Sequence, residues 1–210
     1  MSLMNKVVIA THNKDKQKEI EILLSTFGIT TVTLNSFPEI GDIPETGSTL
    51  EENALIKART VFSITGLASI ADDTGLEVDA LDGAPGVYTA RFAGDGCSYT
   101  DNVKKIIKVM QNIPFDDRGA VFRTVIAYKD SKVELIAQGL VKGYISEKIK
   151  GLDGFGYDPV FYIKEKGKTF AEMKVEEKNV ISHRGRAIKA LKERLIPILA
   201  NNSRIVGGPA

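Results

Sequence analysis

The sequence predicts an α/β fold of buried strands and amphipathic helices, and three observations support this class. Val7 to Ala10 is a short apolar run that leads into a helical pattern, and Ala68 to Ala71 begins a second buried strand. Ala120 to Tyr128 and Val133 to Lys142, joined by a short polar turn, are typical of a β-hairpin. With 210 residues the chain can bury a substantial core, so we expect one domain over residues 1–210, with two lobes around a cleft.

The composition is that of a folded protein and excludes several classes. Lys and Arg number 28 against 27 Asp and Glu, so no overall basic field exists to hold a nucleic-acid polymer. Cys97 is the single cysteine, which excludes an internal disulfide or a cysteine-rich zinc site and favours the cytoplasm. We expect no membrane association, since no apolar run has the length of a span, and no signal peptide. We interpret Met1 to Leu3 as an artificial extension ahead of a native Met4.

A polar turn, Thr11 to Lys16, joins the first strand to the first helix. That helix carries apolar residues at helical spacing before Gly28: Ile20, Leu23, Leu24 and Phe27. Backbone N–H groups at a helix N-terminus, together with Lys14 and Lys16, can cradle a triphosphate. The alternative is an ordinary capped helix whose lysines lie in solvent.

The segment from Thr31 to Gly47 is expected to form a short strand and then a loop rich in Pro and Gly, placed over a cleft. Thr49 and Glu52 have the spacing of a capping box at the start of the next helix. The apolar stripe predicted for that helix is Leu55, Ala58 and Phe62. Asn53 and Lys57 share a different face, which lies toward either the crevice or solvent.

Two adjacent carboxylates, Asp72 and Asp73, follow the second buried strand. Gly75 is expected to break that strand, which would place both carboxylates at a strand end, where open α/β sheets form ligand crevices. Paired carboxylates without a histidine or cysteine cluster suit a hard cation such as Mg²⁺, which shares phosphate oxygens with a substrate. The alternative is an Asp-rich turn that hydrogen-bonds its own backbone.

In the second half of the chain, Ser98 and Asp101 predict a capped helix. Its apolar stripe is assigned to the core and consists of Val103, Ile106, Ile107 and Met110. Phe155 lies between Gly154 and Gly156, so the backbone can approach a ligand and the ring can stack on a base. A glycine-rich turn with a buried phenylalanine is the alternative.

Three basic side chains, Lys178, His183 and Arg184, gather near the start of a final helix that Ser182 can cap. Positive groups oppose the helix dipole there unless an anionic or polar ligand compensates, so the cluster favours a binding role. For His183 a purely structural hydrogen bond is the alternative.

These segments, taken in order, resemble the Ham1-like inosine triphosphate pyrophosphatase family. The resemblance spans nearly the whole chain and is carried by Thr11–Lys16, Glu45–Ala58, Ala71–Leu76, Gly83–Arg91, Gly154–Pro159 and Lys178–Arg184. It implies a two-lobed α/β protein, usually homodimeric, whose long mixed central sheet is flanked by helices. It also implies Mg²⁺-dependent hydrolysis of ITP, dITP and XTP to the monophosphate and pyrophosphate.

The resemblance implies a role for individual residues as well. Substrate would contact Thr11, His12, Asn13, Lys14, Asp15, Lys16, Lys57, Thr74, Phe155, Gly156, Tyr157, Asp158, Lys178, His183 and Arg184. Asp73 would be the general base and a metal ligand. Pro44 stands where the family often has a metal-binding glutamate. We expect Glu45 to supply the second metal ligand from the next position, and the alternative is a carboxylate from elsewhere in the chain.

Two other functions are kept as alternatives. A Maf-like pyrophosphatase for other modified or pyrimidine nucleotides would share the fold but gives no reason for the Ser182–Arg184 cluster. A nucleotide-binding module without catalysis does not explain the metal-suited Asp pair. If purines are the substrate, hypoxanthine and xanthine differ from adenine by a carbonyl at position 6. Arg184, which has only donor groups, is the residue we expect to recognise that carbonyl.

Overall fold

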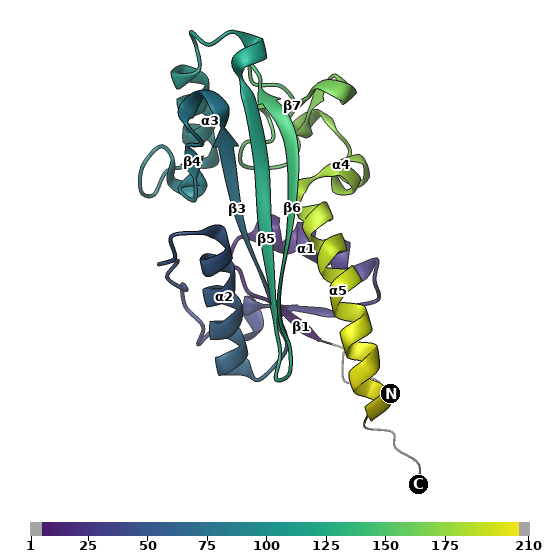
Figure 1. The fold of residues 1–210 in the computed structure, drawn as a ribbon. Coiled ribbons are helices and arrows are strands. Elements are labelled where there is room, and N and C mark those ends of the chain that lie inside the picture. The colour runs from purple at the N-terminus through teal and green to yellow at the C-terminus, as the bar shows by residue number, and fades with distance from the viewer. Residues whose placement is uncertain (1–5, 206–210) are drawn as a thin grey trace.

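A computed structural model describes residues 6–205, with side chains placed for residues 6–198, and contains an eight-stranded mixed sheet (Figure 1). The strands are β1 (Val7–Ile9), β2 (Thr31–Thr33), β3 (Ser69–Val78), β4 (Pro85–Gly86), β5 (Gly119–Lys129), β6 (Glu134–Ile145), β7 (Phe161–Ile163) and β8 (Lys168–Thr169). The helices are α1 (Lys14–Ser25), α2 (Leu50–Thr65), α3 (Tyr99–Val109), α4 (Val175–Ile181) and α5 (His183–Ile205). The strand order is β2-β1-β3-β5-β6-β7-β8, with β4 paired to β3. Parallel pairing joins β1 to β2 and β3, and the other pairs are antiparallel, so the predicted α/β fold with a mixed sheet is confirmed.

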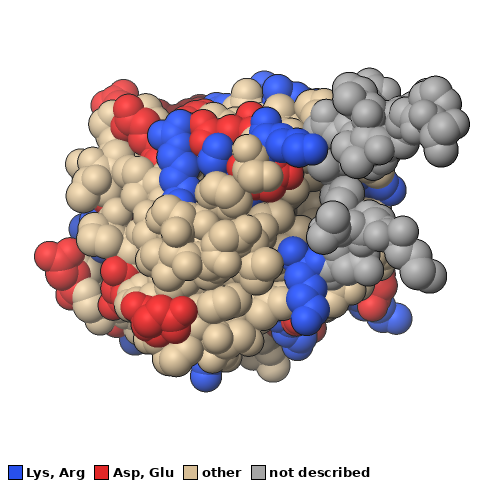
Figure 2. Space-filling model, turned by 90° about the horizontal axis from the view of Figure 1, so that it is seen from below, with Lys and Arg blue, Asp and Glu red and all other residues tan. Residues whose placement is uncertain are grey.

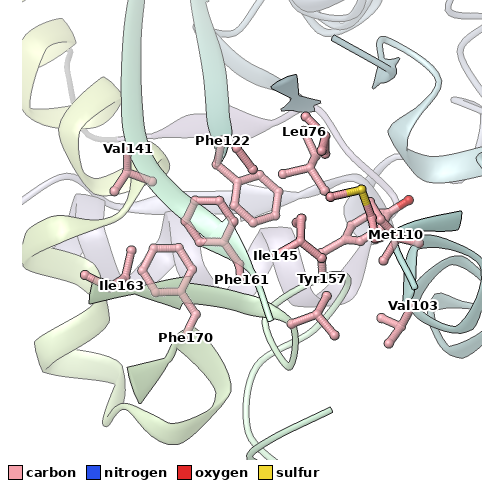
Figure 3. Close-up of a cluster of buried hydrophobic side chains, with 14 of the residues drawn as sticks. Leu76, Val103, Met110, Phe122, Val141, Ile145, Tyr157, Phe161, Ile163 and Phe170 are labelled. Carbon is pink, nitrogen blue, oxygen red and sulfur yellow. The ribbon is translucent and has the colours of Figure 1, made fainter. Parts of the chain in front are cut away.

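Three long strands, β3, β5 and β6, run through both ends of the molecule (Figure 1). The lower lobe consists of β1, β2, α1, α2 and α5 around one end of these strands, and the upper lobe of β4, β7, α3 and α4 around the other. The upper lobe has its own core, in which Phe122, Phe161 and Phe170 pack together (Figure 3). In the lower lobe one buried cluster packs α1 and α5 on the sheet, and another packs α2 on it.

Several local predictions are confirmed. The hairpin of β5 and β6 and the first strand lie where the sequence places them. Ser98 and Asp101 close a capping box at α3, whose residues Val103, Ile106 and Met110 are buried. Ser182 precedes α5, and its hydroxyl accepts a hydrogen bond from the N–H of Gly185 at 3.1 Å. Within α5 the predicted positions Ile188, Leu191 and Leu195 are buried, while the side chain of Leu199 lies outside the described residues.

The prediction that Gly75 ends the second strand is wrong. β3 continues to Val78, and Gly75 pairs with Arg123 of β5, so Asp72 and Asp73 lie in the middle of a strand. Gly75 is needed for a different reason: a Cβ atom there would lie 3.0 Å from the carbonyl oxygen of Gly86, in β4. Gly75 therefore lets the backbone of β4 come close to β3 and does not interrupt the strand.

The predicted stripe of α2 is confirmed at Ala58 and in part at Leu55, which packs against the core, but it does not include all of the buried face. Ala58 is buried, but Leu55 and Phe62 are only half-buried, and the innermost face includes Asn53 and Lys57. These polar side chains are buried because both contact Asp73, which lies far away in the sequence. Thr49 caps the helix as predicted.

The second half of that predicted capping box is absent. Glu52 accepts hydrogen bonds from the N–H and hydroxyl of Ser48, at 2.6 and 2.9 Å. The Glu52 carboxylate thus bonds to Ser48, in the bend before the helix, and not to the N–H of Thr49 as a capping box requires.

The surface carries charges of both signs. Seen from below, basic and acidic side chains are scattered around a large uncharged area, and the described residues of that face form no continuous basic surface (Figure 2). None of the helices within residues 6–205 combines the length and the apolar character that crossing a membrane requires.

The backbone of helix α5 packs directly against Gly139 of β6. A Cβ atom at Gly139 would collide with the backbone carbonyl of His183 and the backbone N–H of Ala187. The absence of a side chain there therefore fixes how near the first turns of α5 come to the sheet.

We expect Gly139→Ala to lower the free energy of unfolding by about 1–3 kcal/mol, because the added methyl group must push a helix backbone away from a packed sheet. Urea denaturation measures this effect. The matched control is Gly41→Ala, since no atom lies within 4 Å of the Cβ position at Gly41. Equal midpoints for the two variants would show that α5 does not pack tightly on β6 at this point.

Candidate active site

A cleft of about 220 Å³ lies between the lobes and receives side chains from both. The predicted site residues that line it are Thr11, Asn13, Lys16, Glu45, Asp73, Thr74, Phe155, Gly156, Tyr157, Asp158, Lys178, His183 and Arg184. Segments far apart in the sequence are thus brought together as the sequence analysis expected. Lys57 and His12 line a second cavity, and Lys14 and Asp15 are exposed outside the cleft.

The turn before α1 is a capped helix start. The Asn13 side-chain oxygen accepts hydrogen bonds from the N–H groups of Asp15 and Lys16, both at 3.1 Å. The helix N–H groups proposed as a phosphate cradle are therefore already partly used. What the turn offers a ligand is the side chains of Thr11, Asn13 and Lys16.

Asp73 faces the cleft and is 6% exposed. Lys57 Nζ donates to Asp73 Oδ1 at 3.1 Å, to Glu45 Oε1 at 2.5 Å and to the Asp72 carbonyl at 2.6 Å. Asn53 Nδ2 donates to Asp73 Oδ2 at 3.3 Å. Burial raises the pKa of Asp73, and the charge of Lys57 only partly opposes this shift. Asp73 is thus a more basic carboxylate than usual, held at the wall of the cleft.

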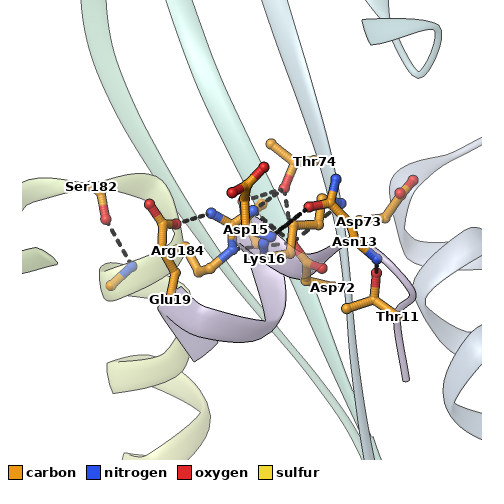
Figure 4. Close-up of polar contacts among 12 residues, drawn as sticks. Thr11, Asn13, Asp15, Lys16, Glu19, Asp72, Asp73, Thr74, Ser182 and Arg184 are labelled. Carbon is orange, nitrogen blue, oxygen red and sulfur yellow. Dashed lines mark hydrogen bonds and ion pairs between the residues drawn. The ribbon is translucent and has the colours of Figure 1, made fainter. Parts of the chain in front are cut away.

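Asp72 points to the opposite face of β3 and is completely buried. Its Oδ2 atom accepts from Arg184 Nη2 at 2.8 Å and Nε at 3.1 Å, and Lys16 Nζ lies 3.4 Å away (Figure 4). Burial alone would raise the pKa of Asp72, but the charges of Lys16 and Arg184 lower it below its ordinary value. Asp72 therefore stays ionised and holds the side chains of Lys16 and Arg184 in position.

Glu19 of α1 joins the same network, although the sequence analysis did not single it out. It accepts from Arg184 Nη1 and, at 2.7 Å, from Lys178 Nζ, which also donates to Asp158 at 2.6 Å. Its position three residues after Lys16, on the same helix face, was the available signal. Because Asp72 and Glu19 engage the Arg184 guanidinium, this side chain is less free to contact a base than expected.

Aromatic rings form the other end of the cleft. Phe155 is half-buried, and its ring centroid lies 5.8 Å from that of Tyr99. The guanidinium carbon of Arg184 lies 5.6 Å from the Phe155 centroid. Tyr99, which the sequence analysis did not select, also accepts a hydrogen bond from Asn13 Nδ2 at 2.7 Å. A flat ligand ring can therefore enter beside Phe155, near the Thr11–Lys16 turn, to which Tyr99 is hydrogen-bonded.

His183 stacks on Phe122, with ring centroids 4.5 Å apart and an angle of 14° between the planes. Its Nδ1 atom is buried and has no hydrogen-bond partner among the described residues. Burial lowers the pKa of His183 well below 6.5, and the charges of Arg184 and Lys178 add to the effect. The imidazole is therefore neutral at neutral pH and presents one donor and one acceptor.

The fold and the cleft define an α/β protein that binds a small ligand with a flat ring and a charged tail. The chain belongs to the Ham1 family, whose sequence profile matches residues 7–194. Relatives named dITP/XTP pyrophosphatase include that of Listeria monocytogenes serovar 1/2a, 47% identical over 93% of this chain and 97% of the relative. That of Caldanaerobacter subterraneus is 43% identical over 95% of this chain and 100% of the relative. The solved structure of a HAM1 protein from Coxiella burnetii has a TM-score of 0.82 and 39% identity, covering 92% and 100% of the two chains.

The buried neutral His183 should make stability depend on pH. Its pKa is lowered in the folded state, so its contribution is complete above the ordinary value of 6.5 and is lost as pH falls from there toward the folded pKa. Without added metal, we expect the native chain to lose about 1 kcal/mol of unfolding free energy between about pH 7.5 and about pH 5.5 through this group. Urea denaturation at the two pH values measures the loss.

The same measurement on His183→Gln should give a smaller difference between the two pH values, whatever the variant's absolute stability. His12→Gln serves as the control, because the His12 side chain is exposed. A pH difference unchanged by His183→Gln would contradict the assignment of a neutral buried imidazole.

Proposed function

We propose that this chain hydrolyses non-standard purine nucleoside triphosphates, dITP and XTP first among them, to the monophosphate and pyrophosphate. The observation that carries the proposal is the position of Asp73, a carboxylate with raised pKa between the Thr11–Lys16 turn and the aromatic end of the cleft. The names and extent of the relatives support the same activity.

In this proposal the base lies at the aromatic end, beside Phe155, and the phosphates lie toward Thr11, Asn13 and Lys16. Recognition of the position 6 carbonyl by Arg184 stays a prediction from the sequence. The contacts of Arg184 with Asp72 and Glu19 favour a positioning role for it, whereas His183 has a buried nitrogen without a partner among the described residues. His183 is therefore the better candidate for meeting the polar edge of the base.

The chemistry needs a water, a base for its proton and positive charge near the phosphates. Asp73 takes the proton as the water oxygen bonds to the α-phosphorus, and the bond from that phosphorus to the α–β bridging oxygen breaks. Pyrophosphate leaves with the bond electrons. Lys16 and Lys57 offset the charge that develops on the phosphate oxygens.

Mg²⁺ is part of the proposal, and the residues present fit it. Glu45 and Asp73 both contact the ammonium of Lys57, so their carboxylates already come within reach of one cation. Oxygen ligands suit Mg²⁺. Within the described part of the chain no group of three or more His, Cys, Asp or Glu could hold a metal, so Glu45 and Asp73 would share the ion with the substrate phosphates. Bound there, Mg²⁺ would neutralise polyphosphate charge and lower the pKa of a coordinated water.

A cytoplasmic homodimer of single-domain chains completes the proposal. The dimer rests on the family resemblance, the single domain on the chain length, and the location on the single Cys97.

We expect the purified chain with Mg²⁺ to release pyrophosphate and the monophosphate from dITP and XTP. It should act poorly on ATP, because a donor that meets the carbonyl at position 6 would face the amino group of adenine instead. A panel of triphosphates with separate detection of pyrophosphate and orthophosphate measures this. Stepwise orthophosphate release would contradict the cleavage site. Preference for pyrimidine nucleotides would favour the Maf-like alternative. If no pyrophosphate were released from any triphosphate, the nucleotide-binding module without catalysis would be favoured.

The substitution Asp73→Asn should lower kcat by about 10²–10⁴-fold with the fold retained, because it removes the general base. The neighbouring Asp72→Asn is the matched control, since it makes the same chemical change on the buried face of β3. We expect Asp72→Asn to lower the urea midpoint more than Asp73→Asn does, because Arg184 and Lys16 lose their carboxylate partner. Near-native turnover of Asp73→Asn would show that Asp73 is not the general base.

A further inference from the structure

The cations around the cleft are already matched by carboxylates. Four cations form ion pairs there with five carboxylates: Lys16, Lys57, Lys178 and Arg184 with Glu19, Glu45, Asp72, Asp73 and Asp158. The cluster is therefore not positive overall. A triphosphate brings several negative charges, so besides the proposed Mg²⁺ a cation that is not already paired would favour binding of its outer phosphates.

Arg91 is a cation of a different kind. It lines the cleft, yet among the described residues its guanidinium has no ion pair and no side-chain hydrogen bond. The guanidinium carbon lies 5.2 Å from the centroid of the Tyr88 ring. The residue is exposed, so the guanidinium has kept its hydration and its donors are available. An anion that enters the cleft meets this charge without breaking an existing salt bridge.

The position of Arg91 indicates which part of a ligand it meets. A second cavity, of about 340 Å³, adjoins the cleft, and the two share Thr11, Asn13, Glu45 and Arg91 in their walls. Phe155 and His183 line the first cavity only. With the base beside Phe155, a phosphate chain that passes Asp73 continues toward the junction where Arg91 lies.

The backbone that carries Arg91 is firmly held. It belongs to a short helical turn, Thr89–Arg91, in which the Thr89 hydroxyl accepts from the Leu76 N–H at 2.7 Å. Tyr157 Oη donates to the Thr89 carbonyl at 3.0 Å, and Asn102 Nδ2 donates to the Ala90 carbonyl at 2.9 Å. The turn is thus tied to β3, to the Phe155 loop and to α3, while the Arg91 side chain is left free.

We propose that Arg91 binds the β- and γ-phosphates of the substrate and holds pyrophosphate as it leaves. The planar guanidinium can donate two parallel hydrogen bonds to phosphate oxygens, which a lysine cannot do. The proposal rests on the pyrophosphatase activity proposed above. It adds a residue that contacts the leaving group on the side of the scissile bond opposite to the base.

The test compares Arg91→Ala and Arg91→Lys with the native chain. We expect Arg91→Ala to lower kcat/KM for dITP by about 10- to 100-fold and to weaken binding of inorganic pyrophosphate by a similar factor. Binding of dIMP should stay within about twofold of native, since the monophosphate does not reach Arg91. Arg91→Lys should recover part of the loss. Titration calorimetry measures both ligands directly, and Lys189→Ala, which removes an exposed charge on α5, is the control.

Three outcomes separate the possibilities. Unchanged pyrophosphate affinity in Arg91→Ala would overturn the proposal. An equal loss of affinity for dIMP would overturn it as well, because Arg91 would then maintain the structure of the cleft and not bind the outer phosphates specifically. If the native chain released no pyrophosphate from any triphosphate, the proposed function would fail. Calorimetry with pyrophosphate needs no turnover, so the two failures can be told apart.

Discussion

The structure depends on the buried contact between Asp72 and Arg184. This pair joins the middle of β3 to the first turn of α5, and Lys16 and Glu19 extend it to α1. A charge as buried as Asp72 is tolerated only when its partners are held close, so the three elements must meet in one arrangement. That arrangement places His183 beside Phe122 and Lys16 in the wall of the cleft. The ion pairs thus specify the geometry of the cleft as well as contributing to the fold.

Asp72 and Asp73 are adjacent in β3 but differ in what they can do, because the strand directs their side chains to opposite faces. Successive side chains of β3 point to opposite faces, so Asp72 and Asp73 meet different surroundings although the chemistry of the two residues is identical. Cations on one face lower the pKa of Asp72, while burial on the other raises that of Asp73. One carboxylate is thereby a permanent anion that orders its neighbours, and the other is available to accept a proton.

Sequence reasoning succeeded where the signal is local and failed where a distant contact decides. Helix caps such as Ser98 with Asp101 and the β5–β6 hairpin follow from neighbouring residues, and ordered motifs identified the family. The buried face of α2 could not be predicted, because Lys57 is buried only through carboxylates brought in by the fold. For the same reason Glu19 and Tyr99 were missed. Lys14 and Asp15 belong to the matching turn but lie outside the cleft, so their contact with substrate stays a prediction.

The continuous ladder of β3, β5 and β6 has a consequence for motion. Its pairs run without a break from Ser69 with Lys129 to Val78 with Ala120, and β6 follows β5 over the same length. Proteins that close on a ligand by rotating one lobe against the other do so about a few residues that can change their backbone angles. Between Ser69 and Ile145 the paired strands show no such joint, so a rotation of one lobe against the other would have to bend three hydrogen-bonded strands together. Any closing movement of the lobes would therefore twist the sheet as a whole and would not turn about a single loop.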